Sequence, residues 1–355
     1  MTGGQVSDQT EIERLKRAID TDDIDGVRAL MTPNPGLHRA PLGYGSNGPL
    51  TWVAECRVPW QTPSAARLAI AAWMIDNGSD VHQGGDGPLM RAALNGDRVP
   101  MMELLVARGA DVNASWDGTF PIIFAPCEAV DPVALTWLLH HGADPNCADP
   151  HREFPGTALD YVIRSYVRSP QLGACIDILL TAGGVTKYNV PVVLDLLCGR
   201  LDRVREHIEA DPALIHRRFP EFDFGTTGGR LLTLKGATLL HVAAEYRDVD
   251  AARLLLDFGT DVNGRATIDD AGVGGQTAIF HAVTQREDAG LPVAHLLIDR
   301  GADLSIRAKV PGHYEYPDEV IDCTPFGYAL RFKDEPNGPD KIQTVALLQE
   351  RGASI

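Results

Sequence analysis

The segment Arg108-Gly109-Ala110-Asp111-Val112-Asn113 decides how this chain folds, because close copies of it return along the sequence. The glycines of the copies are residues 78, 109, 142, 183, 259, 301 and 352. Most copies are 31 to 51 residues apart, and the one gap of 76 fits two units. A period near 33 is typical of a solenoid built from small helical units, each of which buries its apolar face against its neighbours. The repeat therefore predicts an all-α fold.

A second phrase falls between the glycine copies, and its clearest version is Thr238-Leu239-Leu240-His241-Val242-Ala243-Ala244. Variants begin at Thr277 and at Thr324. A threonine can cap a helix, and small alanines let two helices approach closely. A second helix follows each time, and we expect the phrase glycine to stop it by taking a left-handed conformation. Each unit is thus predicted to be a helix-turn-helix.

Together the two phrases resemble the ankyrin repeat, whose T-P-L-H-x-A and G-A-D-V-N signatures they match. The resemblance covers residues 11–355, after a tail at residues 1–10 that we expect to be disordered. It implies an ankyrin-repeat solenoid of about nine units with long inter-repeat loops. The units would open near residues 11, 48, 86, 118, 156, 190, 236, 275 and 323. It also gives His241 a structural role, because that residue fills the family's usual histidine position.

The bulk composition narrows the class of partner. The net charge is −16 with a pI near 5.0, which argues against binding nucleic acid or an anionic membrane. Six cysteines without a C-x-x-C pair favour reduced thiols in a cytosolic protein. The first residues lack the apolar region of a signal peptide, although residues 1–5 resemble part of an expression tag. The apolar run at residues 68–75 is too short to span a bilayer. We therefore expect a cytoplasmic location.

Long connections interrupt the regular pattern at residues 32–47, 216–235, 265–276 and 307–322. The last three occupy successive junctions, and insertions at equivalent points of a solenoid map to one edge, which is often the binding face. The insertions at residues 216–235 and 307–322 also carry aromatic residues, which tend to be packed or to contact ligands. We expect these three loops to cluster beside the concave face of repeats seven to nine. The alternative is that they merely cover apolar surface of the repeats.

The resemblance also indicates which helix residues would line a concave groove, namely the two positions after the alanines of each first helix. In the last three repeats these are Glu245 and Tyr246, Thr284 and Gln285, and Arg331 and Phe332. With the loops, they give a predicted surface for a protein or peptide partner. Its candidate binding residues are Asp223, Arg230, Glu245, Tyr246, Asp269, Gln285, His313, Tyr316, Arg331 and Phe332.

An enzyme or a small-molecule binder is the alternative function. Its acid–base groups in a loop-walled pocket would be Glu245, Asp269, His281 and His313. His241 and Glu245 share a helix face and could contribute to a metal site, yet the structural role of His241 speaks against one. We expect neither a metal nor a cofactor. Residues 43–48 match G-x-G-x-x-G, but the prolines before them disfavour the strand that a dinucleotide site needs, so we expect a flexible loop.

Overall fold

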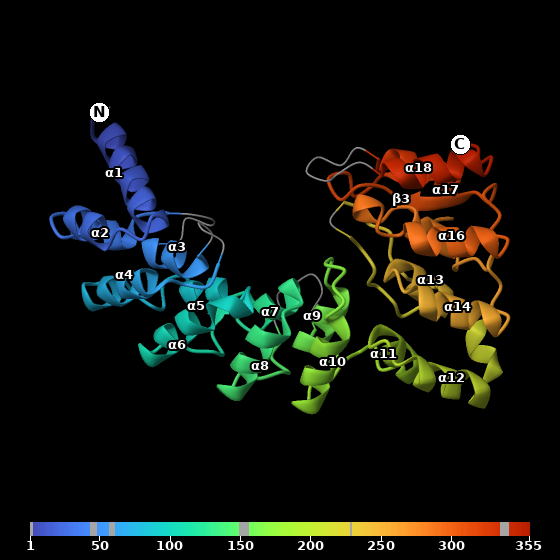
Figure 1. Ribbon diagram of the computed structural model, residues 1–355, viewed down its shortest axis with the longest axis horizontal. Helices are drawn as coiled ribbons and strands as arrows, with labels where there is room; N and C mark the ends of the chain where they lie inside the picture. Colours follow the sequence, from blue (N-terminus) through green and yellow to red (C-terminus); the bar gives the residue numbers. More distant parts are fainter. Residues whose placement is uncertain (1–2, 43–47, 57–60, 149–155, 228, 334–340) are drawn as a thin grey trace. The chain divides into compact units, whose positions relative to one another are not determined.

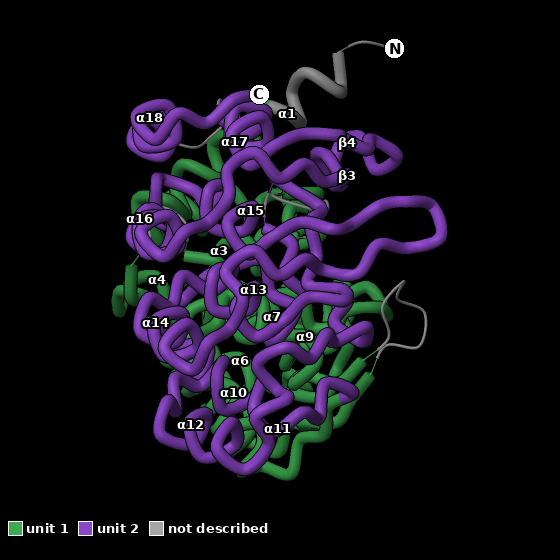
Figure 2. The backbone as a smooth tube through the Cα atoms, turned by 90° about the vertical axis from the view of Figure 1, so that its right-hand side faces the viewer, with its two compact units in different colours: residues 1–162, 174–186 green, residues 163–173, 187–355 purple. Residues whose placement is uncertain are grey.

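The computed structural model describes residues 3–42, 48–56, 61–148, 156–227, 229–333 and 341–355. The chain divides into two compact units. Unit 1 comprises residues 1–162 and 174–186, and unit 2 comprises residues 163–173 and 187–355 (Figure 2). Helices dominate both units. None of the described helices is both long and apolar enough to span a membrane.

Unit 1 contains a series of helix pairs (Figure 1). The helix α1 begins at Gly3, so most of the segment that we expected to be a disordered tail is helical. The helices are α1 (Gly3–Asp20), α2 (Ile24–Met31), α3 (Pro49–Glu55), α4 (Ala65–Asp76), α5 (Gly87–Ala92), α6 (Val99–Ala107), α7 (Phe124–Ala129) and α8 (Pro132–His140). The boundary between the units falls within α9 (Ala158–Arg164) and α10 (Leu172–Thr181). Shorter elements are the 3-10 helices η1 (Pro35–Arg39) and η3 (Gly96–Arg98), and the strands β1 (Ser115–Trp116) and β2 (Phe120–Pro121), which pair antiparallel.

Unit 2 continues the pattern in two helical layers, which Figure 2 shows side by side. The first helices are α11 (Pro191–Leu197), α13 (Leu239–Glu245), α15 (Ala278–Ala282) and α17 (Pro325–Arg331). The second helices are α12 (Leu201–Ala210), α14 (Val249–Asp257), α16 (Leu291–Asp299) and α18 (Ile342–Glu350). The 3-10 helices η4 (Pro212–Ile215) and η5 (Arg286–Asp288) lie in the connections. The strands β3 (Ala308–Pro311) and β4 (Val320–Cys323) form an antiparallel hairpin on the side of the first helices that faces away from the second.

The phrase glycines stop the second helices as predicted. All seven have a left-handed backbone, with φ between 74° and 120°. The residue four positions earlier, for example Leu105 or Leu255, is fully buried, and its carbonyl accepts the amide of the residue after the glycine. This is the hydrogen bond of a Schellman cap, which satisfies a carbonyl that the helix leaves unpaired. Around Gly259 a Cβ atom would meet nothing within 4 Å, so the backbone conformation, not packing, requires the glycine.

The asparagine of the phrase joins one repeat to the next. In unit 2, the amide of Asn263 donates to the carbonyl of Gly301 over 3.1 Å, while its carbonyl accepts the backbone amide of Asp303 over 2.8 Å. In unit 1, Asn113 makes the same pair of bonds to Gly142 and Asp144. The phrase therefore ends a helix and aligns the next turn with it.

Candidate functional site

The three successive insertions of unit 2 are joined to one another by backbone hydrogen bonds. We call residues 216–235, 265–276 and 307–322 the insertion platform. The amide of Thr267 donates to Gly236 beside the first insertion over 2.9 Å, and the amide of Gly274 donates to Lys309 over 2.7 Å. The third insertion also pairs with the first, through an isolated bridge between Arg230 and His313. The prediction that these loops cluster is confirmed.

The inner side of the platform is a small aromatic core. Phe219, Phe222 and Phe224 of the first insertion are buried. The rings of Phe219 and Phe222 stack with centroids 4.7 Å apart, and that of Phe224 lies 4.9 Å from Phe222. These aromatic residues hold the loop to the repeats and are not available to a ligand. The alternative, that the insertions cover apolar surface of the repeats, therefore describes the aromatic residues of the first insertion.

The outer side of the platform exposes large apolar side chains. Ile268 is 54% exposed, Tyr314 54%, Tyr316 58% and Val320 51%. They come from the second and third insertions, which carry them on ordered backbone. These four side chains give the platform an exposed apolar surface.

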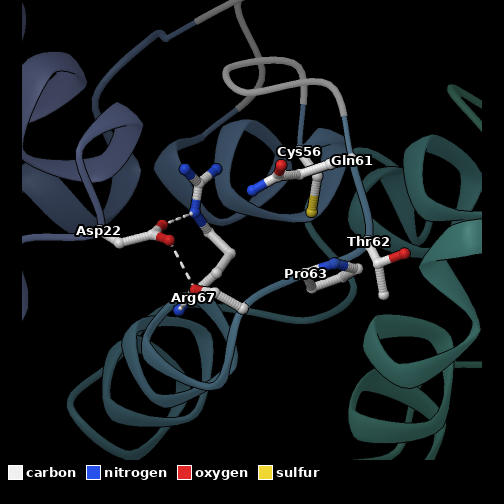
Figure 3. A pocket seen from close by; sticks show the side chains of 7 residues that line it. Asp22, Cys56, Gln61, Thr62, Pro63 and Arg67 are labelled. Carbon is white, nitrogen blue, oxygen red and sulfur yellow. Dashed lines mark hydrogen bonds and ion pairs between the residues drawn. The ribbon is translucent and has the colours of Figure 1, made fainter.

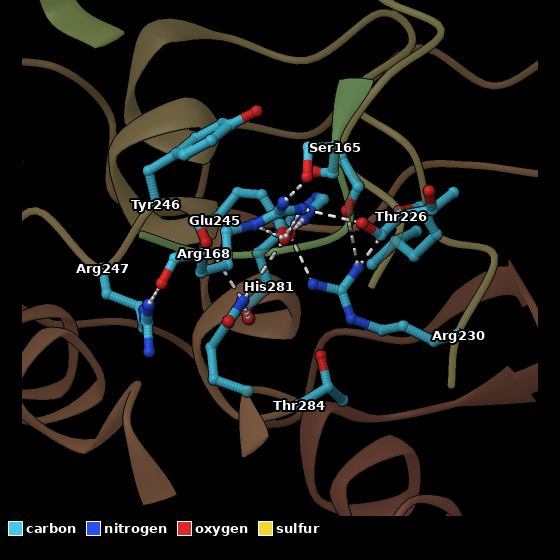
Figure 4. Close-up of polar contacts among 12 residues, drawn as sticks. Ser165, Arg168, Thr226, Arg230, Glu245, Tyr246, Arg247, His281 and Thr284 are labelled. Atoms are coloured by element: carbon cyan, nitrogen blue, oxygen red, sulfur yellow. Dashed lines mark hydrogen bonds and ion pairs between the residues drawn. The ribbon is translucent and has the colours of Figure 1, made fainter. Parts of the chain in front are cut away.

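Beneath the platform lies a buried charged cluster centred on Glu245, the last residue of α13 (Figure 4). Its Oε1 atom accepts hydrogen bonds from Nη2 and Nε of Arg168, over 2.7 and 3.1 Å. Its Oε2 atom accepts one from Nη2 of Arg230 and one from Nδ1 of His281, the latter over 2.7 Å. Glu245, Arg230 and His281 are all fully buried. One carboxylate thus binds two guanidinium groups and an imidazole away from water.

The two arginines link the cluster to the loops that cover it. Arg168 also donates to the carbonyls of Ser165 and Thr226, over 2.7 and 2.9 Å. Arg230 donates to the carbonyl of Leu232 over 3.0 Å. Each guanidinium therefore fixes backbone of the first insertion, and Arg168 also fixes the segment at residues 165–168. The planar fork of several donors makes arginine suited to such bridging.

Burial alone raises the pKa of the Glu245 carboxyl. The charges of Arg230 and Arg168 and the hydrogen bond from His281 outweigh this effect, so the pKa lies far below its ordinary value. Burial lowers the pKa of His281, against the opposing attraction of Glu245. A neutral His281 that donates from Nδ1 leaves Nε2 without a proton, and Nε2 has no hydrogen-bond partner among the described residues.

The neighbouring residues of the cluster follow the ends of α13 and α15. Gln285 donates to the carbonyl oxygens of Glu245 and His281 over 3.1 and 3.0 Å. The ring of Tyr246 lies under the guanidinium of Arg168, 4.7 Å away, and its hydroxyl donates to the carbonyl of Ile163 over 3.0 Å. Burial raises the pKa of Tyr246 to about 12. These groove candidates act as packing and hydrogen-bonding groups of the interior.

His241 has the structural role that the resemblance implied. Its Nδ1 accepts from the hydroxyl of Thr238 over 2.9 Å, and its Nε2 donates to the carbonyl of Gln276 over 3.0 Å. Burial lowers the pKa of His241 to about 3, so the ring is neutral at neutral pH. It joins the start of α13 to the second insertion.

The remaining predicted residues are dispersed over the platform and the end of α17. Asp223 binds Lys187 over 2.8 Å and also accepts from Tyr188. Asp269 is exposed and accepts the backbone amides of Ala271 and Val273 within its own turn. His313 is buried, with its ring centroid 6.2 Å from that of buried Phe332. Arg331 is exposed and pairs with Glu319 over 2.9 Å. The groove predicted to be open at Glu245, Gln285 and Phe332 is therefore closed by buried side chains.

Arg168 is the main residue that the sequence reasoning missed. It lies between α9 and α10, 77 residues from Glu245, and belongs to neither repeated phrase. The sequence offers one weak signal, because the connection at residues 165–171 is longer than a tight turn. The predicted groove residues near Glu245 did not indicate that it pairs with Arg168.

The cluster is not arranged as an acid–base catalyst. Of the four residues considered for catalysis, Glu245 and His281 meet, whereas Asp269 and His313 make the other contacts described above. A carboxylate held by two guanidinium groups is a weak base, and neither it nor His281 is exposed to solvent. The geometry instead serves to hold loops in place. Among the described residues, no group of three or more His, Cys, Asp or Glu side chains is placed to bind a metal ion.

Unit 1 has a small hollow at Cys56, shown in Figure 3. Asp22 accepts hydrogen bonds there from Arg67 and Ser64, both over 2.5 Å. The hollow measures about 10 Å³, which leaves room for one water molecule. It is too small for an organic ligand. Of the G-x-G-x-x-G match, residues 43–47 lie outside the described residues.

Comparisons with known proteins agree with the repeated signatures. The family model for three copies of the ankyrin repeat matches residues 204–308, and the family model for a single ankyrin repeat matches residues 84–117. The chain is similar to a protein of Fowlpox virus (strain NVSL) named as ankyrin repeat protein FPV022. The two are 23% identical over 261 residues, which cover 70% of this chain and 42% of the relative. The chain thus spans about two fifths of the length of that relative. With its repeated phrases and helix pairs, the chain contains ankyrin repeats, which the family models match at residues 84–117 and 204–308.

Proposed function

We propose that this protein binds a protein or peptide partner through the outer surface of the insertion platform. Ankyrin repeats generally serve as protein–protein interaction modules. The observation that carries the proposal is the ordered cluster of three insertions with Ile268, Tyr314, Tyr316 and Val320 on its outside. Tyrosine is enriched among the residues that dominate binding energy. We also propose that the successive helix pairs are nine repeats of one solenoid, and that the protein acts in the cytoplasm.

The platform is suited to binding because its backbone is already ordered. The hydrogen bonds between Gly274 and Lys309 and between Leu231 and Gly312 hold the insertions together. A partner would then not have to order these loops, which lowers the cost of association. The groove positions support the platform from below, and exposed Arg331 is the groove candidate that could extend the contact surface.

The test measures affinity for a partner recovered from the source cells. We would co-purify partners with the full chain, then express the recovered protein and titrate it with purified variants. Replacing Tyr314 and Tyr316 together by alanine should weaken binding by at least about tenfold, since each is expected to contribute more than about 1 kcal/mol. Ile342→Ala is the matched control, because Ile342 is 63% exposed on α18 in the same unit. Unchanged affinity in the tyrosine variant, with the fold intact, would refute the placement.

A further inference from the structure

A cationic hollow lies between the second and third insertions of the platform. It measures about 260 Å³, and glycines 272, 274 and 275 line one part of it. Its charged lining residues are Arg265, Arg307, Lys309 and Asp322. Three cations therefore face one carboxylate, in a chain whose net charge is −16. A local charge opposite to that of the whole chain is a candidate for recognising an anionic group.

Two of the three cations lack a carboxylate partner among the described residues. Arg307 is paired with Asp322, with Nε and Oδ1 3.1 Å apart. Arg265 donates only to the backbone carbonyl of Arg307, over 2.5 Å. Lys309 and Arg265 are exposed, and neither forms an ion pair within the described part of the chain. The hollow thus offers two cationic groups at its wall.

Backbone hydrogen bonds and a glycine fix the walls of the hollow. Gly274 has φ 117°, and a Cβ atom there would lie 2.2 Å from the carbonyl oxygen of Thr267. The amide of Gly274 donates to Lys309, and the amide of Ala266 donates to Gln276 over 2.9 Å. The two walls are therefore joined to each other and held before any ligand arrives. Exposed Ile268 also lines the hollow, so an apolar surface lies next to the cations.

We propose that this hollow binds a carboxylate side chain from an acidic peptide segment of the partner. The inference rests on the proposed function and names the chemistry of the segment that docks. The carboxylate would accept hydrogen bonds from Arg265 and Lys309, while a neighbouring apolar side chain packs on Ile268. Charge-assisted bonds of this kind are stronger than neutral ones.

The size and the overall charge favour a peptide over a polyanion. A volume of about 260 Å³ lies just below the usual range for pockets that hold drug-sized ligands, so it fits one or two side chains. A nucleic acid or an anionic membrane would meet the negative charge of the rest of the chain. A short peptide with one acidic residue beside apolar residues carries little negative charge, so the negative charge of the rest of the chain repels it less.

The test uses the full chain and two fluorescent peptides that differ only in charge. One alternates glutamate with leucine and glycine, and the other carries glutamine in place of each glutamate. We expect the acidic peptide to bind at low salt and the glutamine peptide to bind at least about tenfold more weakly. Added salt should lower the affinity of the acidic peptide. R265A and K309A should each lower affinity for the acidic peptide by about tenfold.

The control variant is R253A, which removes one positive charge from an exposed position of α14 in the same unit. It should leave affinity for the acidic peptide unchanged. Equal losses in R253A and K309A would overturn the site, as would equal binding of both peptides. Tighter binding of a single-stranded oligonucleotide or of anionic vesicles would also overturn the peptide assignment. Circular dichroism and thermal unfolding would verify that each variant is folded.

The two proposals fail in different ways. If the partner still binds the R265A/K309A double variant as tightly as it binds the wild type but loses affinity for the tyrosine variant, the platform stands and the acidic segment is wrong. If the partner binds the tyrosine variant normally, the proposed function fails, whatever the peptides do.

Discussion

Replacing Glu245 by glutamine should destabilise unit 2 strongly, although the side chain keeps its shape. The substitution leaves Arg168 and Arg230 charged, buried and without their carboxylate. Both Glu245 oxygens accept from donors, Oε1 from Arg168 and Oε2 from Arg230 and His281. Glutamine offers one acceptor oxygen and one donor amide, so one of the guanidinium groups would face a second donor.

The expected loss is about 3–5 kcal/mol, the usual cost of removing one partner from a buried ion pair. This is a large part of the roughly 5–15 kcal/mol that stabilises a domain. For a body of roughly 150–250 residues, each kcal/mol lowers Tm by about 2–4 °C, so we expect Tm to fall by roughly 6–20 °C.

The assay is urea unfolding of the full chain followed by circular dichroism, together with thermal melts. Glu209→Gln is the control, since Glu209 is exposed on α12 of the same unit, and it should change the free energy of unfolding by less than about 0.5 kcal/mol. Adding Arg230→Met to Glu245→Gln should restore about 0.5–3 kcal/mol, because it removes one unpaired charge. If Glu245→Gln stays within about 1 kcal/mol of the wild type, the cluster does not hold unit 2 together and the reasoning fails.

Three further predictions concern the repeats. Because the pKa of His241 is lowered to about 3, the unfolded state binds more protons between pH 6.5 and 3. The contribution of His241 to the free energy of unfolding should therefore be fully present above pH 6.5 and fall by about 1.4 kcal/mol for each pH unit below it. Unfolding midpoints measured across this pH range should show a shallower slope for His241→Gln, and an equal slope would contradict the assignment. Asn263→Ala removes two bonds to the next repeat and should cost about 1–3 kcal/mol in urea unfolding, whereas no change would deny its aligning role. Gly259→Ala should cost about 1–2 kcal/mol because alanine is strained at φ 90°, and a neutral result would mean that the turn can rearrange.

The repeat architecture could be predicted because its signals are local. A phrase such as Gly259-Thr260-Asp261-Val262-Asn263 stops a helix through its own backbone, and the stop does not depend on distant residues. The clustering of the insertions was also predictable, because insertions at equivalent points of a repeat share an edge. The phrase did not predict the hydrogen bonds of Asn263, because its partners belong to the following repeat.

The candidate site was predicted less well because exposure depends on what covers a position. In the repeat register, Glu245 and Gln285 belong to a groove that faces solvent. In this chain the first insertion and residues 163–173 cover that surface, and Arg168 and Arg230 neutralise the carboxylate that they bury. The pairing joins residues 77 and 15 positions apart, a separation that no periodic pattern marks. The sequence reasoning named Glu245 and His281, which do meet, but it assigned Glu245 to a surface that faces solvent.

The buried cluster gives the platform its geometry, and this has a consequence for binding. A well-packed apolar core could stabilise the insertions equally, since buried ion pairs seldom add net stability. The guanidinium groups, however, hydrogen-bond particular carbonyls, including those of Thr226 and Leu232, and so fix where the first insertion runs. The backbone bridge between Arg230 and His313 then fixes the hairpin that bears Tyr314 and Tyr316 relative to the first insertion. Glu245→Gln should therefore weaken partner binding under conditions in which the variant remains folded, although it changes no exposed atom. Full affinity in such a folded variant would mean that the platform keeps its shape without the cluster.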